Sequence, residues 1–186
     1  MKTQFDTEKI IELGKILNEL DFERALIADR KLRVLAKENS KLKSVRKKLR
    51  DLIQDYESNN WSGKSKISEK RLRESDSAEI IAEKERLFIE RRKELIKSKL
   101  KRLSLNQEEL GVLLGHKSKS YISELMNGVS PFSLKDLIII NRLLKINLTD
   151  LVPTFLPYTG RIKIKSFIEK LDNPKLKLSK DDFTLV

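Results

Sequence analysis

The strongest constraint on the fold of this chain is a series of short, well-capped helices predicted for residues 104–152. Asn106 can cap a helix over Gln107–Leu114, and Glu109 lies where a capping box requires it. Leucines spaced three and four residues apart give this helix one apolar face. Gly115 follows and ends the helix, because glycine adopts the left-handed conformation without steric cost.

A second short helix is predicted from the N-cap Ser118 to Met126, closed by the turn-forming pair Asn127-Gly128. Its buried stripe is Ile122, Leu125 and Met126. The residues predicted to face outward are Lys119, Ser120, Tyr121, Ser123 and Glu124. Gly111, in the middle of the first helix, costs about 1 kcal/mol relative to alanine. Its presence there predicts that another helix crosses closely at that point.

Two further helices complete this part of the chain. Ser133 can cap the next helix with Asp136 at its third position, and a short helix, Leu148–Leu151, ends before Pro153. Together with a preceding helix over about Arg91–Leu103, these elements predict a five-helix bundle. Apolar residues that continue its core are Leu134, Leu137, Ile138, Leu144 and Ile146. Such a bundle is the arrangement by which one helix is presented to the major groove of DNA.

This stretch closely resembles the helix-turn-helix of lambda-repressor-like (XRE) regulators. The residues that carry the resemblance are Gln107-Glu-Glu-Leu110-Gly111, Leu114-Gly115, Ser118, Ile122-Ser123, Leu125 and Asn127-Gly128. Gly111 stands where the family usually has alanine, and the turn that holds His116 and Lys117 is one residue longer than the commonest form. The resemblance implies sequence-specific binding to double-stranded operator DNA by a homodimer. The alternative is a protein-binding adaptor whose bundle no longer binds DNA.

The outward positions of the second helix define the expected DNA contacts. Base contacts are expected from Lys119, Ser120 and Glu124, since Lys can donate to guanine and Glu can accept from cytosine. Phosphate contacts, which set register rather than sequence preference, are expected from Gln107, Lys117, Ser118, Tyr121, Asn127 and Ser130.

The N-terminal part predicts a helical leader over residues 1–57. Its three helices are expected at Thr7–Leu20, at Phe22–Lys37 after the cap Asp21, and from the cap Ser40 to Glu57. A polar linker is expected over 58–77, followed by a domain over 78–152 that consists of a long helix through Arg102 and the helix-turn-helix. The fold class is therefore all-α, with the long helix joining the leader to the bundle.

Two segments of the leader resemble HigA-type antitoxins more weakly. They are Phe22-Glu23-Arg24-Ala25-Leu26 and the run from Leu49 to Glu57, LRDLIQDYE. The resemblance implies an antitoxin that represses its own operon and neutralises a ribonuclease toxin. This leader is basic, whereas leaders of that family are usually acidic. A plain repressor without a toxin remains the alternative.

The positive charge of the chain lies outside the predicted DNA-reading unit. The net charge is +12, but residues 104–152 carry 5 Lys/Arg against 5 Asp/Glu. Residues 61–103 carry 14 Lys/Arg against 8 Asp/Glu, and residues 1–60 carry 14 Lys/Arg against 11 Asp/Glu. Flanking segments can still attract phosphate over a long range. For residues 1–60 we favour the simpler interpretation that lysine-rich helix faces are solvated and have no partner.

The composition argues against catalysis and against a membrane protein. The chain has no cysteine and a single histidine, His116, so the thiolate and histidine clusters of zinc chemistry are absent. No glycine-rich phosphate loop or nucleophile elbow is found, and neither a cofactor nor a catalytic residue is expected. No segment approaches the roughly 20 apolar residues of a membrane span, so a cytoplasmic location is expected.

The C-terminal segment, residues 153–186, leaves several alternatives open. Arg161–Ser166 alternates charged and apolar residues and predicts a strand, and Lys175-Leu-Lys-Leu predicts another after the turn at Asn173-Pro174. A small β hairpin, a dimerisation arm and a mobile basic tail all fit this pattern.

Overall fold

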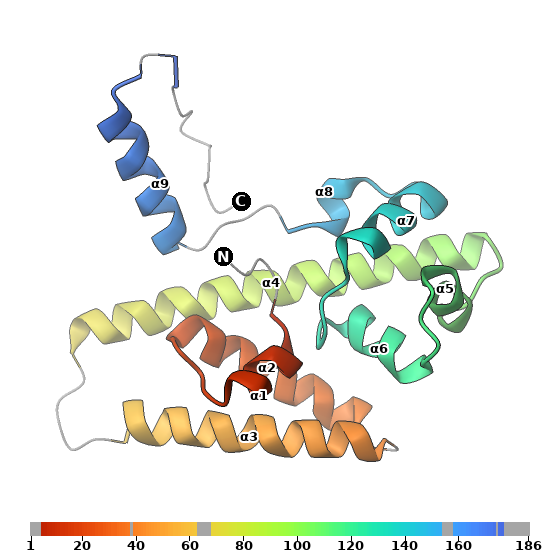
Figure 1. Cartoon of the computed structure of the whole chain (residues 1–186), viewed down its shortest axis with the longest axis horizontal. Helices are drawn as coiled ribbons and strands as arrows, with labels where there is room; N and C mark the ends of the chain where they lie inside the picture. Colours follow the sequence, from red (N-terminus) through yellow and green to blue (C-terminus); the bar gives the residue numbers. More distant parts are fainter. Residues whose placement is uncertain (1–4, 38, 63–67, 154–157, 174, 177–186) are drawn as a thin grey trace. The chain divides into compact units, whose positions relative to one another are not determined.

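The computed structural model describes residues 5–37, 39–62, 68–153, 158–173 and 175–176. Every regular element within these residues is an α-helix, which confirms the all-α prediction (Figure 1). The chain divides into two compact units, Met1–Val152 and Pro153–Val186.

The leader contains the helices α1 (Thr7–Leu13), α2 (Glu19–Leu35) and α3 (Ser40–Asn60). The single helix expected over 7–20 is wrong, because Gly14 adopts a φ of 68° and ends α1. Asn18 then caps α2 by accepting from the backbone N–H of Asp21 at 2.9 Å. The cap of α2 thus lies three residues before the expected one, because the side chain of Asn18 satisfies one of the N–H groups left free at the start of the helix.

The helix α4 spans Glu69–Arg102 and is capped by Ser68. The linker expected over 58–77 is therefore wrong at both ends, because α3 extends to Asn60 and α4 begins at Glu69. Residues 63–67 lie outside the described part of the chain. The segment 69–77 is rich in Glu, Lys and Arg, whose helix propensity sustains the helix without an apolar stripe.

The leader helices pack on α4 as well as on one another. α2 lies between α3 and α4 and contacts both (Figure 1). The apolar face of α2 consists of Phe22, Ala25, Ala28 and Leu32. These residues share one core with residues of α3 such as Leu42 and Leu49. Residues 1–152 therefore form one compact unit, and the boundary expected between 57 and 78 does not separate two.

The helix-turn-helix part contains α5 (Gln107–Leu114), α6 (Lys119–Asn127), α7 (Leu134–Leu144) and α8 (Leu148–Leu151), as the caps predict. The last turns of α4 complete the five-helix bundle, whose core includes Ile96, Leu100, Leu110, Leu125, Ile140 and Leu151.

A buried arginine ties this bundle to the long helix. Arg92 of α4 is 3% exposed, donates from Nη1 to the carbonyl of Leu151 at 3.0 Å, and lies over the ring of Phe132. Burial lowers the pKa of Arg92 to about 10, which leaves the guanidinium protonated at neutral pH.

The C-terminal unit contains α9 (Tyr158–Leu171), so the strand expected over Arg161–Ser166 is wrong. Ile164, Phe167, Ile168 and Leu171 follow helical spacing, and this longer pattern outweighs the short alternation. The turn at Asn173 is present, with the N–H of Leu176 donating to its carbonyl at 2.9 Å. The second expected strand, over 175–178, lies partly outside the described residues, and its described part is not a strand.

Candidate nucleic-acid interface

The turn between α5 and α6 is fixed by caps on both sides. Asn106 accepts from the N–H of Glu109 at 3.0 Å, and the Glu109 carboxylate accepts from the N–H of Asn106 at 2.7 Å. Gly115 ends α5 with a φ of 84°, and Ser118 caps α6 by accepting from the N–H of Tyr121 at 3.3 Å. The predicted capping box, glycine stop and second cap are all present, so the local sequence sets this geometry.

The two helices cross closely at Gly111, as its position in mid-helix predicts. A Cβ added there would lie 3.4 Å from the Cβ of Ile122, at the limit of ordinary contact. Ile122 is 1% exposed, so a larger side chain at position 111 would have no space on this side.

His116 holds the turn against α7. Its Nε2 lies 3.1 Å from Oδ1 of Asp136, and its ring meets the ring of Tyr121 edge-on at 5.0 Å. Asp136 is 3% exposed and also accepts from the N–H and hydroxyl of Ser133, at 2.9 and 2.7 Å. The side chain of His116 therefore connects the turn to α7 and to the first turn of α6.

Several expected DNA contacts lie together at the N-terminal end of α6. Lys117, Ser118 and Lys119 are exposed, and the hydroxyls of Ser118 and Ser120 are 2.8 Å apart. The Nζ of Lys119 forms an ion pair with Oε2 of Glu108 at 2.6 Å. Tyr121 and the first residue of α5, Gln107, are half-buried beside this cluster.

Glu124 does not face outward, contrary to the sequence-based expectation. The residue is 4% exposed, and its Oε2 accepts from the hydroxyl of Ser130 at 3.4 Å. Burial and the nearby carboxylate of Glu8 raise the pKa of Glu124, while Lys41 opposes them. Glu8 and Lys41 belong to the leader, so the leader lies on this side of α6 and removes Glu124 from the candidate base contacts.

Two expected phosphate contacts have structural roles instead. Ser130 is buried with Glu124. The side-chain oxygen of Asn127 accepts from Nζ of Lys93, and its backbone carbonyl accepts from Nζ of Lys31, both at 2.8 Å. These two lysines come from α4 and α2, and their charge also suits the negative end of the helix dipole. Nothing in the local sequence around 127 indicates partners so distant.

The loop after α6 is bonded to the start of the leader. Thr7, whose residue exposure is 0%, donates from its hydroxyl and its N–H to the carbonyl of Val129, at 2.9 and 3.3 Å. The C-terminal end of α6 is thus held by hydrogen bonds from α1, α2 and α4, whereas Lys117, Ser118 and Lys119 at its start are exposed.

The neutral charge count of residues 104–152 conceals an uneven distribution. Of the five acidic side chains, Glu124 and Asp136 are buried and Glu109 is bound to the N-cap backbone. Glu108 is paired with Lys119, and Asp150 lies 3.8 Å from Arg91. Lys117 and Lys135 remain exposed with no ion pair to any described residue. The outer surface is therefore more cationic than the sequence count indicates.

A direct consequence of this burial concerns Glu124→Gln. The folded state binds a proton at Glu124 more readily than the unfolded state, so the stability of the wild type falls as pH rises above about 4.3. The uncharged amide of the variant carries no such penalty. We expect Glu124→Gln to be more stable than the wild type at pH 7 and the difference to shrink toward pH 4, measured by urea unfolding. A variant that is less stable at pH 7 would contradict this.

Residues 96–151 match the helix-turn-helix family model. The match begins in the last two turns of α4 and ends with α8, and it supports the lambda-repressor-like helix-turn-helix predicted from the sequence. It covers less than a third of the chain.

Neither the curated proteins nor the solved structures gave a match to the chain. In the described part of the chain, no helix is both long and apolar enough to span a bilayer.

Proposed function

We propose that this protein is a sequence-specific DNA-binding transcription regulator that presents α6 to the major groove. The observation that carries the proposal is the exposed N-terminal turn of α6, which projects from a two-helix unit whose every end is capped. A recognition helix needs both exposed side chains and well-capped ends, because base contacts require side chains on a rigid support. Because its binding site is DNA, we also propose that the regulator acts in the cytoplasm.

The roles we assign follow from exposure and position. Lys119 and Ser120 make base contacts, and Lys119 leaves Glu108 to do so. Lys117 and Ser118 bind phosphate at the start of α6. Gln107 binds phosphate through its side chain at the start of α5, where the positive end of the helix dipole favours an anion. Tyr121 adds a phosphate contact through its hydroxyl. Glu124, Asn127 and Ser130 receive no role in DNA contact.

Replacing Lys119 and Lys117 separately tests these assignments. Lys119→Ala should relax one position of the operator consensus and weaken binding by about 1–3 kcal/mol. Lys117→Ala should weaken binding evenly across operator variants and flatten the salt dependence by about one phosphate. Binding-site selection followed by salt titration measures both effects. An unchanged consensus for Lys119→Ala, or an unchanged salt slope for Lys117→Ala, would refute the corresponding role.

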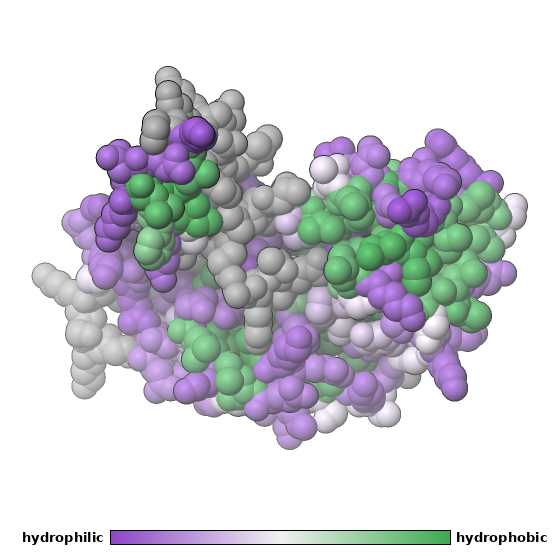
Figure 2. Space-filling model, turned by 45° about the horizontal axis from the view of Figure 1, so that its top comes forward, coloured by the Kyte–Doolittle hydropathy of each residue, from purple (hydrophilic) through white to green (hydrophobic). Residues whose placement is uncertain are grey.

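The same selection tests whether the regulator is a homodimer, which we also propose. Figure 2 shows apolar side chains gathered on the helix-turn-helix end of the molecule. Val112 on α5 and Leu134 on α7 are 74% and 71% exposed, and Ile138 lies one turn after Leu134. A second copy of the chain would cover such residues and align two half-sites. A palindromic consensus supports the dimer, and a single half-site contradicts it.

The finer proposal, an antitoxin that masks a ribonuclease toxin, is supported by the sequence resemblance of the leader. The segment 49–57 lies on α3, where Leu49, Ile53 and Tyr56 are buried in the core of the leader. Its exposed face, which a toxin could contact, consists of Arg50, Asp51, Gln54, Asp55 and Glu57. Co-expression with the product of a neighbouring toxin gene, scored by growth, tests it. If the cells stop growing although the full chain is present, the antitoxin proposal is wrong and the alternative of a plain repressor stands.

A further inference from the structure

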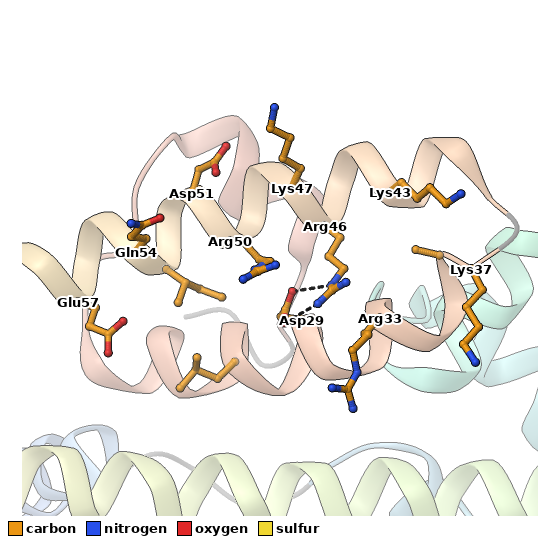
Figure 3. A pocket seen from close by; sticks show the side chains of 13 residues that line it. Asp29, Arg33, Lys37, Lys43, Arg46, Lys47, Arg50, Asp51, Gln54 and Glu57 are labelled. Atoms are coloured by element: carbon orange, nitrogen blue, oxygen red, sulfur yellow. Dashed lines mark hydrogen bonds and ion pairs between the residues drawn. The ribbon is translucent and has the colours of Figure 1, made fainter.

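A groove of about 830 Å³ runs between α2 and α3 (Figure 3). Six cationic side chains line it, against three acidic ones: Arg33, Lys37, Lys43, Arg46, Lys47 and Arg50 against Asp29, Asp51 and Glu57. Arg46 bonds to Asp29 at 2.9 Å across the groove. The other five cations form no ion pair with any described residue, and all five are exposed.

The cations of α3 are segregated along the helix. Residues 40–50 carry six Lys or Arg and no acidic residue, whereas residues 51–60 carry three acidic residues and no Lys or Arg. This order opposes the helix dipole, which favours negative charge at the N-terminus and positive charge at the C-terminus. Neither end of α3 has a compensating charge. The placement therefore does not serve the stability of the helix itself.

The basic end of α3 is the end nearest the helix-turn-helix. Lys41 in its first turn pairs with Glu8 of α1 at 3.4 Å, and it also acts on the charge of Glu124 in α6. Thr7, beside Glu8, is bonded to the carbonyl of Val129 just after α6. Lys43, Lys47 and Arg50 then continue away from this point at helical spacing on one face.

We infer that the basic half of the groove binds the sugar-phosphate backbone of the duplex that flanks the site read by α6. The inference rests on the proposed function and extends its DNA interface to the leader. Residues 40–50 span about 15 Å of helix, which is the length of several phosphates along one strand. Within this stretch Lys43, Lys47 and Arg50 form a row of exposed cations without an ion pair to any described residue. Such a row fits an extended polyanion better than one compact anion.

This assignment changes the interpretation of the charge in residues 1–60. The sequence favoured solvated lysine-rich faces without a partner, because the segment has a net charge of only +3 over 25 charged residues. The fold brings Arg33 and Lys37 of α2 beside the basic half of α3, and the acidic half of α3 lies at the other end of the groove. The local excess is therefore much larger than the average.

The test compares two pairs of substitutions that remove the same charge. Lys43→Gln/Lys47→Gln alters the groove, and Lys70→Gln/Arg73→Gln alters exposed residues at the start of α4, outside it. Each protein is titrated with two duplexes that carry the selected operator, one with no flanks and one with about ten base pairs on each side. Far-UV circular dichroism confirms that both variants fold.

We expect the groove variant to bind the flanked duplex about tenfold or more weakly at 0.1 M salt, with a salt slope flatter by about two. The groove variant should bind the unflanked duplex as tightly as the wild type does. The α4 variant should bind both duplexes as tightly as the wild type does. Equal behaviour of the two variants, or a wild type that gains nothing from flanks, would overturn the inference and leave the proposed function intact. Failure of the wild type to select any DNA sequence would overturn the proposed function and the inference together.

Discussion

Replacing Arg24 with alanine is expected to lower the free energy of unfolding by about 3 kcal/mol. Arg24 of α2 forms two hydrogen bonds with the carboxylate of Glu85 in α4, one of them from Nε to Oε2 at 2.6 Å. Their side chains are only 9% and 15% exposed. Removal of the guanidinium leaves a carboxylate that is largely buried and without its main partner, which is why the loss is large.

A matched control is available on α4. Arg73 also pairs with a glutamate, Glu69, at 3.0 Å, but these side chains are 79% and 86% exposed. Exposed pairs contribute at most about 1 kcal/mol, so Arg73→Ala should have little effect in the same denaturant titration. The double variant Arg24→Met/Glu85→Leu should regain most of the stability, because neither charge is then left unpaired. An Arg24→Ala variant as stable as Arg73→Ala would contradict the prediction.

Gly128→Ala is expected to destabilise the protein by about 2–4 kcal/mol, for two independent reasons. Gly128 ends α6 with a φ of +70°, a conformation that costs an L side chain free energy. A Cβ at this position would also lie 2.6 Å from Cδ1 and 3.0 Å from Cγ2 of Ile89 on α4. The variant must therefore move α6 away from the long helix or displace the Ile89 side chain.

Gly14→Ala separates the two contributions. Gly14 has nearly the same φ, +68°, but a Cβ there would meet nothing within 4 Å. Its alanine variant should show only the backbone cost, about 1–2 kcal/mol. Adding Ile89→Ala to Gly128→Ala should reduce the loss toward that value. If thermal and denaturant unfolding show that Gly128→Ala and Gly14→Ala lose equal stability, the contact of a Cβ at position 128 with Ile89 has no measurable cost. The second reason given for Gly128→Ala is then wrong.

The prediction for Gly128 concerns the attachment of α6 to distant parts of the chain. Lys31 and Lys93 bond to Asn127, Thr7 bonds to Val129, and Ile89 lies against Gly128. These contacts fix the C-terminal end of α6 and leave its N-terminal turn exposed. Variants that weaken them should therefore alter DNA affinity through the orientation of α6 without altering the residues that touch DNA.

The sequence by itself determined the elements of the helix-turn-helix. Asn106, Gly115, Ser118 and Ser133 mark the ends of α5, α6 and α7, since each cap acts on backbone groups within one turn. Gly111 likewise indicated the close crossing of α6, because a missing Cβ in mid-helix has a local cost that only tight packing offsets.

Only the tertiary structure decided which of the predicted site residues are accessible. Glu124 follows the same helical pattern as an exposed residue, but the leader covers it, and Ser130 is buried with it. The pairing of Asn127 with Lys31 joins residues 96 positions apart. The basic groove also exists only because α2 and α3 are antiparallel neighbours, which places Arg33 beside Lys43 and Arg46. Caps and periodicity depend on neighbours in the chain, whereas burial and local charge depend on which distant helix packs against a given face.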